Sequence, residues 1–319
     1  QQGNTLETLP LSGEKQRAAI DAARQSLGSI VLGKNAEISL SLACLLARGH
    51  LLIEDLPGLG KTILAQSLAR VLGLSFQRVQ FTSDLLPADI VGVSVFHQES
   101  GQFQFQKGPI FAELVLADEV NRATPKAQSA LLEAMEERQV SVDGTTHTLP
   151  SPYVVVATQN PSDQIGTFPL PESQLDRSLM RVRLGYPNED SERALLTGAD
   201  RRQLLTEIEP SLNPATLIEL QKAAAKVHMT DPLVDYIQAL VRFTRESPEV
   251  EIGLSPRGSL ALVAAARAHA FIENHSGVFP DDVQAVFVAV AGHRLKPASN
   301  SAFRTQAELS RHVLDNVRI

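Results

Sequence analysis

The sequence is short of cysteine and of long apolar runs, and each shortage removes a class of protein. Its 319 residues include one cysteine, Cys44, and no tryptophan. A single cysteine cannot form a disulfide within the chain, which excludes a disulfide-stapled scaffold, and its apolar neighbours indicate a buried, unreactive thiol. No apolar run approaches the roughly 20 residues that a membrane-spanning helix needs. Because no charged-then-apolar leader opens the sequence either, we expect a cytoplasmic protein.

Basic clusters and the spacings of zinc ligands are missing as well. The net charge is −7, and no block rich in lysine or arginine stands out, so nucleic acid is an unlikely partner. The eight histidines form no HExxH motif and no paired Cys/His spacing, which argues against a dedicated zinc site. What the chain does have is 43% hydrophobic residues, enough for two domains with proper cores.

The segment LLIEDLPGLGKT, residues 51–62, is a short apolar run followed by a glycine-containing loop. A helical pattern follows at once, which is the order that a phosphate-binding loop, or P-loop, requires. Gly58 and Gly60 allow the backbone to turn its N–H groups inward, toward the positive end of the next helix. We expect Lys61 to reach the β- and γ-phosphates of a nucleotide and the Thr62 hydroxyl to ligate Mg²⁺.

One position departs from the full P-loop pattern, because Asp55 stands where a glycine is expected. An acidic residue fits at the base of the loop if its side chain points away from the phosphates. The alternative interpretation is an ordinary strand-turn-helix corner with a surface lysine, since short motifs recur by chance.

A second apolar run, residues 114–117, ends in two adjacent carboxylates, Asp118 and Glu119. Burying carboxylates costs several kcal/mol unless a positive charge compensates. We therefore interpret the pair as a Walker B motif, in which Mg²⁺ held on Thr62 compensates Asp118 and Glu119 polarises the attacking water. The alternative is a strand that exposes two acids to solvent.

Two β-hairpins are predicted between the strands of the sheet. Apolar and polar residues alternate across residues 93–105 on both sides of a short polar turn, which is the period of a hairpin. A second hairpin is predicted over residues 139–149, because Asp143 and Gly144 form a typical type I′ turn pair.

A further strand is predicted over residues 153–157, and Asn160 follows it. In a parallel sheet the tip of this strand lies beside the acid-bearing strand, so Asn160 could orient the attacking water. The alternative is an asparagine used only for turn chemistry before Pro161.

From residue 189 onward the sequence shows no strand pattern and is rich in alanine and leucine, which predicts an all-helical second domain. Helix starts are indicated where a capping residue directly precedes a proline. There are three such pairs, Asn213-Pro214, Asp231-Pro232 and Ser255-Pro256.

Arg257 breaks a local rule in this region. A cation in the first turn of a helix opposes the helix dipole, at a cost of a few tenths to about 1 kcal/mol. A bound phosphate would reverse that penalty, so Arg257 is the candidate by which the helical domain senses the nucleotide. The alternative is an exposed arginine bonded to a neighbouring acid.

With these motifs in place, the chain resembles the MoxR family of AAA+ ATPases from about residue 14 to its end. The resemblance rests on five segments: LLIEDLPGLGKT, QFTSDLLPADIVG, KGPIFAELVLADEVNRATPKAQSALLEAMEERQVSVDG, ATQNPSDQIGTFPLPESQLDRSLMRV and GLSPRGSLAL. It implies an α/β fold: an αβα P-loop domain with a parallel sheet and β-hairpin inserts over residues 14–187, then an all-helical lid over 188–319. The polar residues 1–13 are expected to be a mobile tail.

The resemblance also implies roles for individual residues. The Walker A residues are Lys61 and Thr62, the Walker B residues Asp118 and Glu119, sensor 1 Asn160, sensor 2 Arg257, and the arginine finger Arg177. The expected nucleotide contacts are Gly58, Leu59, Gly60, Lys61, Thr62 and Ile63, with Val31 and Leu32 at the adenine and Thr62 and Asp118 on the metal. Because Ser178 stands where the family usually has phenylalanine, Arg181, Arg183 or Arg122 could share the finger's role.

The implied function is an ATP-hydrolysing ring, commonly a hexamer, that remodels or matures partner proteins with ATP and Mg²⁺ as cofactors. A separate polypeptide with a von Willebrand factor A domain is the expected partner. The first alternative is a nucleotide-gated binding scaffold that scarcely hydrolyses ATP. A DNA motor or transcription activator is disfavoured because the sequence has neither a basic pore nor a GAFTGA-type loop, and a GTPase because it has no guanine-recognition motif.

Overall fold

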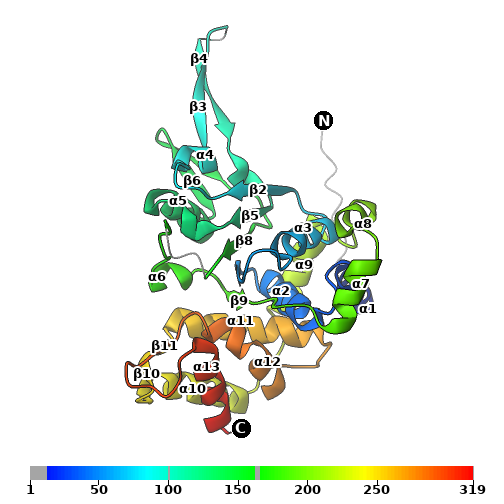
Figure 1. Cartoon of the computed structure of the whole chain (residues 1–319), viewed down its shortest axis with the longest axis vertical. Coiled ribbons are helices and arrows are strands. Elements are labelled where there is room, and N and C mark those ends of the chain that lie inside the picture. Colours follow the sequence, from blue (N-terminus) through cyan, green and yellow to red (C-terminus); the bar gives the residue numbers. More distant parts are fainter. Residues whose placement is uncertain (1–12, 100, 162–165, 319) are drawn as a thin grey trace.

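The sheet at the centre of the molecule is parallel, as the sequence predicts. The computed structural model describes residues 13–99, 101–161 and 166–318. Five strands form the sheet in the order β2-β5-β8-β1-β9 (Figure 1). Their bounds are β1 (Leu51–Glu54), β2 (Phe76–Gln80), β5 (Leu114–Asp118), β8 (Val154–Gln159) and β9 (Met180–Val182).

The two faces of this sheet bury separate cores. Side chains alternate along β1, so Leu51 and Ile53 join one hydrophobic cluster and Leu52 joins the other. Helices from both sides therefore cover the inner strands, which explains why β1, β5 and β8 are almost continuously apolar, whereas the edge strand β2 is mostly exposed. The covering helices are α1 (Gly13–Ile30), α2 (Asn35–Leu46) and α3 (Lys61–Val71) on one face and α4 (Pro87–Val91) and α5 (Pro125–Glu137) on the other.

Parallel strands bring all their carboxyl ends to one edge of the sheet, and three of the predicted site segments end there. In the register, Glu54 lies opposite Gln159 and Gln80 lies opposite Asp118. The P-loop and the acid pair therefore leave the same edge, with the β8 tip between them. Two short 3₁₀ turns complete this half of the chain, η1 (Pro109–Phe111) and η2 (Val120–Arg122).

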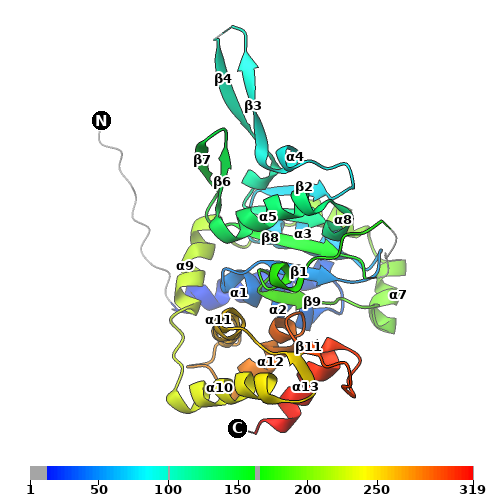
Figure 2. The same cartoon turned by 90° about the vertical axis from the view of Figure 1, so that its left-hand side faces the viewer.

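Both predicted hairpins are present and project from the body on the side of α5 (Figures 1 and 2). They consist of β3 (Gly92–His97) with β4 (Gln102–Lys107), and β6 (Gln139–Val142) with β7 (Thr145–Thr148). Asp143 and Gly144 both have positive φ, as a type I′ turn requires. The Phe105 ring stacks on His147 with ring centroids 4.0 Å apart, which fastens one hairpin to the other.

The C-terminal half is mostly helical. Its helices are α6 (Glu172–Leu175), α7 (Glu189–Thr197), α8 (Arg201–Glu207), α9 (Pro214–Ala224), α10 (Asp231–Glu246), α11 (Pro256–Ile272), α12 (Pro280–Ala291) and α13 (Gln306–Asn316). Helices α8 and α9 pack on α1, α2 and α3, whereas α10 to α13 form the layer below, joined to the rest through α11 against α2 (Figure 1).

The expectation of a strand-free second domain was wrong in one detail. Two short strands, β10 (Val250–Ile252) and β11 (Lys296–Pro297), pair antiparallel there. Strands this short carry too few residues to show a period of two in the sequence.

Two of the predicted helix caps are confirmed, since Asn213 and Ser255 each accept a hydrogen bond from the N–H three residues on. The third is displaced by one residue, because α10 begins at Asp231 itself and Thr230 takes the cap position.

Two further expectations concern the start of the chain and its cysteine. Helix α1 begins at Gly13, and the rest of the proposed N-terminal tail lies outside the described residues. Cys44 is fully buried, and burial raises the pKa of its thiol to about 12, which fits an unreactive side chain. Within the described residues no helix is both long and apolar enough to cross a membrane.

Candidate nucleotide site at the carboxyl edge of the sheet

The loop between β1 and α3 has the backbone conformation of a phosphate-binding loop. Gly58 and Gly60 have φ of 83° and 86°, and a Cβ built on either would meet no neighbouring atom within 4 Å. The glycines are therefore needed for their backbone angles and not for space. Lys61 opens α3, and its ammonium group donates hydrogen bonds to the carbonyl oxygens of Asp55 and Leu56, the latter at 3.2 Å. The charge thus points into the loop.

Asp55, the departure from the P-loop pattern, binds one backbone N–H outside the loop and one next to it in the chain. One of its carboxylate oxygens accepts a 2.6 Å hydrogen bond from the N–H of Gly185, and the other accepts one of 2.9 Å from Leu56. Gly185 belongs to the linker that leads from β9 to α7. The acid therefore ties the base of the loop to this linker, consistent with the expectation that it points away from the phosphates.

The buried carboxylate of Asp118 is compensated by groups of this chain. Arg78 on β2 donates two hydrogen bonds to it, at 2.6 and 3.1 Å, and the Thr158 hydroxyl donates a third at 2.5 Å. The sequence analysis assigned this compensation to Mg²⁺, and the structure adds Arg78 as a positive charge of the chain itself beside the acid. A carboxylate and the Thr62 hydroxyl remain oxygen ligands of the kind that Mg²⁺ prefers.

Glu119 stands next to Asp118 in a left-handed conformation, with φ of 56°. Its N–H donates to the Thr158 hydroxyl at 2.9 Å. Gln80 and Arg122 both donate to its Oε2, at 3.1 and 3.0 Å. The carboxylate is thus held at the edge of the sheet by two neighbours, and both bonds fall on the same oxygen.

Asn160 follows the tip of β8 and is buried, with 5% of its surface exposed. This residue sits beside the acid strand, as the sequence predicted, and the P-loop strand lies on the other side of β8. Its carbonyl oxygen accepts a hydrogen bond of 3.3 Å from Asn121, the residue that begins the path from the acid pair to α5.

A pocket of about 770 Å³ opens beside this edge, between α3, β2 and α8. Thr62 and Ile63 line it together with Arg78, the arginine that contacts Asp118, so the pocket runs along the P-loop helix and β2, and the two acids themselves do not line it. Arg70 and Arg202 also line it. The three guanidinium groups favour an anionic ligand.

The turn expected at the adenine lies on the other side of the P-loop. Val31 is buried and Leu32 partly so. Ser191 of α7 lies so close to Gly33 that a Cβ there would meet its hydroxyl at 2.2 Å. Lys34 donates to the carbonyl of Tyr186 at 2.9 Å, in the same linker that Asp55 holds. The turn, the linker and the loop base therefore form one contiguous wall, and the residues present fit a nucleoside triphosphate with Mg²⁺.

Arg177 and Arg257 lie at the opposite, amino edge of the sheet. Arg177 comes just before β9, and Arg257 lies in the first turn of α11. Both pair with Glu136 at the end of α5, at 2.9 and 2.6 Å. The structure does not bring Arg257 to the P-loop of its own chain; it shows the alternative of an arginine bonded to a neighbouring acid. The Walker A, Walker B and sensor 1 candidates thus gather at one edge, and these two arginines lie at the other.

The other finger candidates are engaged within the chain. Arg181 donates to Glu54, to the Gly292 carbonyl at 2.5 Å and to Gln306 at 2.8 Å, with only 10% of its side chain exposed. It therefore joins the end of β1 to the C-terminal helices and cannot reach outward. Burial alone would raise the pKa of Glu54, but Arg181 and Arg183 hold it below its usual value.

Several of these residues escaped the sequence argument. Arg78, Thr158 and Glu136 each act through a partner far away in the chain. Arg78 alone is marked in the sequence, as a cation within a predicted strand. Its partner becomes clear only when the order of the strands places β2 beside β5.

Comparison with known proteins agrees with this geometry. Residues 50–180 match the model of the ATPase family associated with various cellular activities (AAA), and residues 242–313 match the AAA lid domain. The chain is 43% identical over 299 residues to the uncharacterized protein YeaC of Bacillus subtilis, with 93% of each covered. It is 40% identical over 280 residues to chaperone MoxR1 of Mycobacterium tuberculosis, covering 83% of this chain and 72% of that protein.

The chain belongs to the MoxR family of AAA+ ATPases. A crystal structure of a candidate ATPase from Cytophaga hutchinsonii superposes with a TM-score of 0.87 at 33% identity, covering 96% of both chains. The MoxR resemblance and the predicted fold class, a parallel-sheet AAA+ domain followed by a helical lid, are thus both confirmed. Nucleotide binding at the carboxyl edge is what this family membership implies.

Proposed function

We propose that this MoxR-family chain hydrolyses ATP in a ring, with each site completed by arginines of the adjacent copy. The observation that carries the proposal is the division of charge across one sheet. The loop and acids that would hold MgATP leave the carboxyl edge, whereas Arg177 and Arg257 lie at the amino edge. A rigid chain cannot bring both to one phosphate, but a neighbouring copy can.

The residues at the carboxyl edge divide the work. Backbone N–H groups of the loop and the Lys61 ammonium bind the phosphates, and the Thr62 hydroxyl and the Asp118 carboxylate would hold Mg²⁺. The metal, when bound, neutralises charge on the phosphate oxygens. Oε2 of Glu119 takes the bonds from Gln80 and Arg122, so Oε1 is the atom placed to accept a proton from water. Asn160 would orient that water.

Arg177 and Arg257 of the adjacent copy would supply positive charge for the transition state at this edge. Negative charge spreads over the phosphoryl oxygens in the transition state, and an arginine from a neighbour is worth roughly 10³ to 10⁵ in rate. Hydrolysis should therefore depend on assembly. We propose a hexamer, the common ring size in this superfamily.

The work done with ATP is proposed to be the remodelling of a partner protein. Phe96 and Phe103 pair on the projecting β3–β4 hairpin with ring centroids 5.2 Å apart. They remain 50% and 72% exposed, and aromatic residues are enriched in protein–protein interfaces, so the pair is a candidate contact for a partner. A chaperone role fits the name of the M. tuberculosis relative, and a von Willebrand factor A domain protein remains the proposed partner.

Substitution of Arg177 tests the proposal. In Arg177→Ala we expect ATP turnover to fall at least about 10³-fold, while nucleotide binding is retained because the P-loop is untouched. Phosphate release and binding of a fluorescent ATP analogue measure the two separately. Arg242→Ala, which removes an exposed arginine of α10, is the matched control. If the wild type released no phosphate with Mg²⁺, the chain would be a nucleotide-gated scaffold instead.

A further inference from the structure

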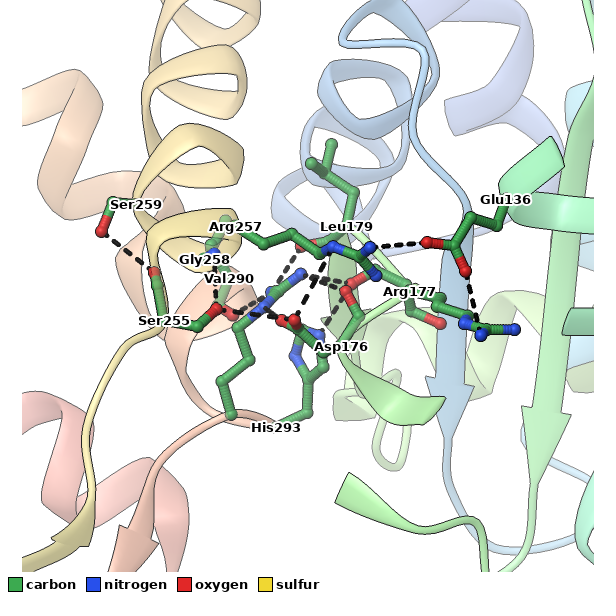
Figure 3. Close-up of polar contacts among 12 residues, drawn as sticks. Glu136, Asp176, Arg177, Leu179, Ser255, Arg257, Gly258, Ser259, Val290 and His293 are labelled. Carbon is green, nitrogen blue, oxygen red and sulfur yellow. Dashed lines mark hydrogen bonds and ion pairs between the residues drawn. The ribbon is translucent and has the colours of Figure 1, made fainter. Parts of the chain in front are cut away.

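Glu136 receives one arginine from each half of the molecule. Its Oε2 pairs with Arg177 at 2.9 Å, and its Oε1 accepts a hydrogen bond of 2.6 Å from Arg257. Figure 3 shows the carboxylate between the two guanidinium groups, with Arg177 entering from the segment before β9 and Arg257 from α11. A single acid at the end of α5 thus joins the P-loop domain to the helical layer.

The base of this cluster is buried and fixed. Arg294 has only 4% of its side chain exposed and donates to Asp176 at 2.6 Å. It also donates to the carbonyl oxygens of Ser178 and Leu179, at 2.7 and 3.0 Å. The Ser255 cap of α11 reaches the same Asp176 at 3.5 Å. These contacts to Asp176 therefore fix the backbones that carry Arg177 and Arg257 (Figure 3).

The two upper guanidinium groups, in contrast, are open to the outside. Half of the Arg257 side chain and 29% of the Arg177 side chain are exposed. They face a pocket of about 250 Å³ that is also lined by Arg48, Arg138 and Arg294. Arginines outnumber acids around this pocket, so Arg177 and Arg257 repel each other and the positive surface attracts an anion. Glu136 is the group that holds both guanidinium ends together against that repulsion.

We propose that Glu136 is a positioning residue that presents Arg177 and Arg257 as one dibasic unit to the triphosphate bound by the adjacent copy. This inference rests on the proposed function and adds to it a residue that touches no nucleotide. The contact also couples the two halves of the chain. Because Arg177 and Arg257 come from different halves, both bind the adjacent nucleotide only when α11 lies against α5 as it does here.

The first test is Glu136→Gln, which keeps the shape and removes the charge. We expect kcat for ATP to fall about tenfold with KM little changed, since the own P-loop is intact. Glu137→Gln, an exposed acid at the same helix end, is the matched control and should retain wild-type turnover. In an Arg257→Ala background, Glu136→Gln should cost much less than it does alone, because the two act as a unit.

A mixing experiment separates positioning from a structural role. Glu136→Gln subunits keep their own nucleotide site, and Glu119→Gln subunits keep their arginines. Mixed rings should therefore hydrolyse more ATP than the sum of the separate variants. Unchanged or raised turnover in Glu136→Gln, or no gain on mixing, would overturn the inference. If Arg177→Ala retained turnover, the proposed function itself would fail, whatever Glu136 does.

Discussion

The two edges of the central sheet pair acids with arginines in opposite ways. At the carboxyl edge two buried acids each pair with an exposed arginine, and Glu54 has the largely buried Arg181 as a second partner. The side chains of Asp118 and Glu54 are each 9% exposed, whereas those of Arg78 and Arg183 are 48% and 55% exposed. A buried carboxylate with a displaceable cation suits a site that must accept a metal ion.

At the amino edge the order is reversed. Arg294 is the buried partner, 4% exposed against 22% for Asp176. Above it, Arg257 is half exposed and shares Glu136 with Arg177. An exposed guanidinium pair on a fixed base suits recognition of an anion that comes from outside. The difference supports the proposal that each edge would supply half of a phosphoryl-transfer site, completed between two copies of the chain.

The largest effect is expected where the carboxyl edge carries the chemistry. Glu119→Gln should lower ATP turnover by about 10²- to 10⁴-fold, because the amide cannot accept the proton of water. Nucleotide binding should persist, so ATP-bound assemblies should accumulate and be visible by light scattering. Glu133→Gln, an exposed acid of α5, is the control. Normal turnover in Glu119→Gln would show that another residue is the general base and would contradict the assignment of the chemistry to the carboxyl edge.

The next largest effect is expected in the free energy of unfolding, which should differ between substitutions at the two edges. Arg294→Met should lower the free energy of unfolding by roughly 3 kcal/mol, because it leaves Asp176 and buried carbonyl oxygens without their donor. Arg183→Met should cost less than about 1 kcal/mol, since that arginine is exposed and Arg181 still compensates Glu54. Urea unfolding monitored by circular dichroism measures both. Equal losses would show that burial does not distinguish the two edges.

A smaller effect, dependent on pH, is expected from His50 at the amino edge. It accepts from the N–H of Val155 at 2.9 Å and lies 3.0 Å from the Met135 carbonyl, as only the neutral ring can. Burial lowers the pKa of His50 to about 4. The unfolded state, with a histidine pKa near 6.5, therefore binds the proton more readily, so stability is lost as the pH falls below about 6.5.

The expected loss from this residue between pH 8 and pH 5 is about 2 kcal/mol. In His50→Gln the unfolding midpoint should fall less over that range than in the wild type. His228→Gln is the control for a histidine remote from both edges. An unchanged pH slope in His50→Gln would show that the ring is not the group that titrates.

The sequence was informative where a site residue adjoins a strand in the chain. Asp118 follows an apolar run directly, and Lys61 and Asn160 follow theirs after a few polar or loop residues, so their meeting at one edge follows from a parallel sheet. Asp143-Gly144 likewise carries its turn geometry within two residues. Such features can be predicted from the sequence because they depend only on residues close together in the chain.

Contacts between distant segments could not be predicted in this way. Glu136 and Arg257 are 121 positions apart, and Arg78 and Asp118 are 40 apart. Their pairing depends on the order of strands and on how α11 packs, neither of which a periodicity shows. For the same reason the sequence did not reveal Arg78 as a partner of Asp118, because the order of strands was unknown.

The stacked rings of Phe105 and His147 make the two hairpins a single stiff arm. That arm is rooted in α5, since β6 begins directly after the helix ends. Glu136 occupies the last turn of the same helix, so under the proposed function the contact with a neighbour's phosphate would share one short piece of backbone with the base of the arm. A small tilt of that backbone would displace Phe103, on the arm, further than Glu136.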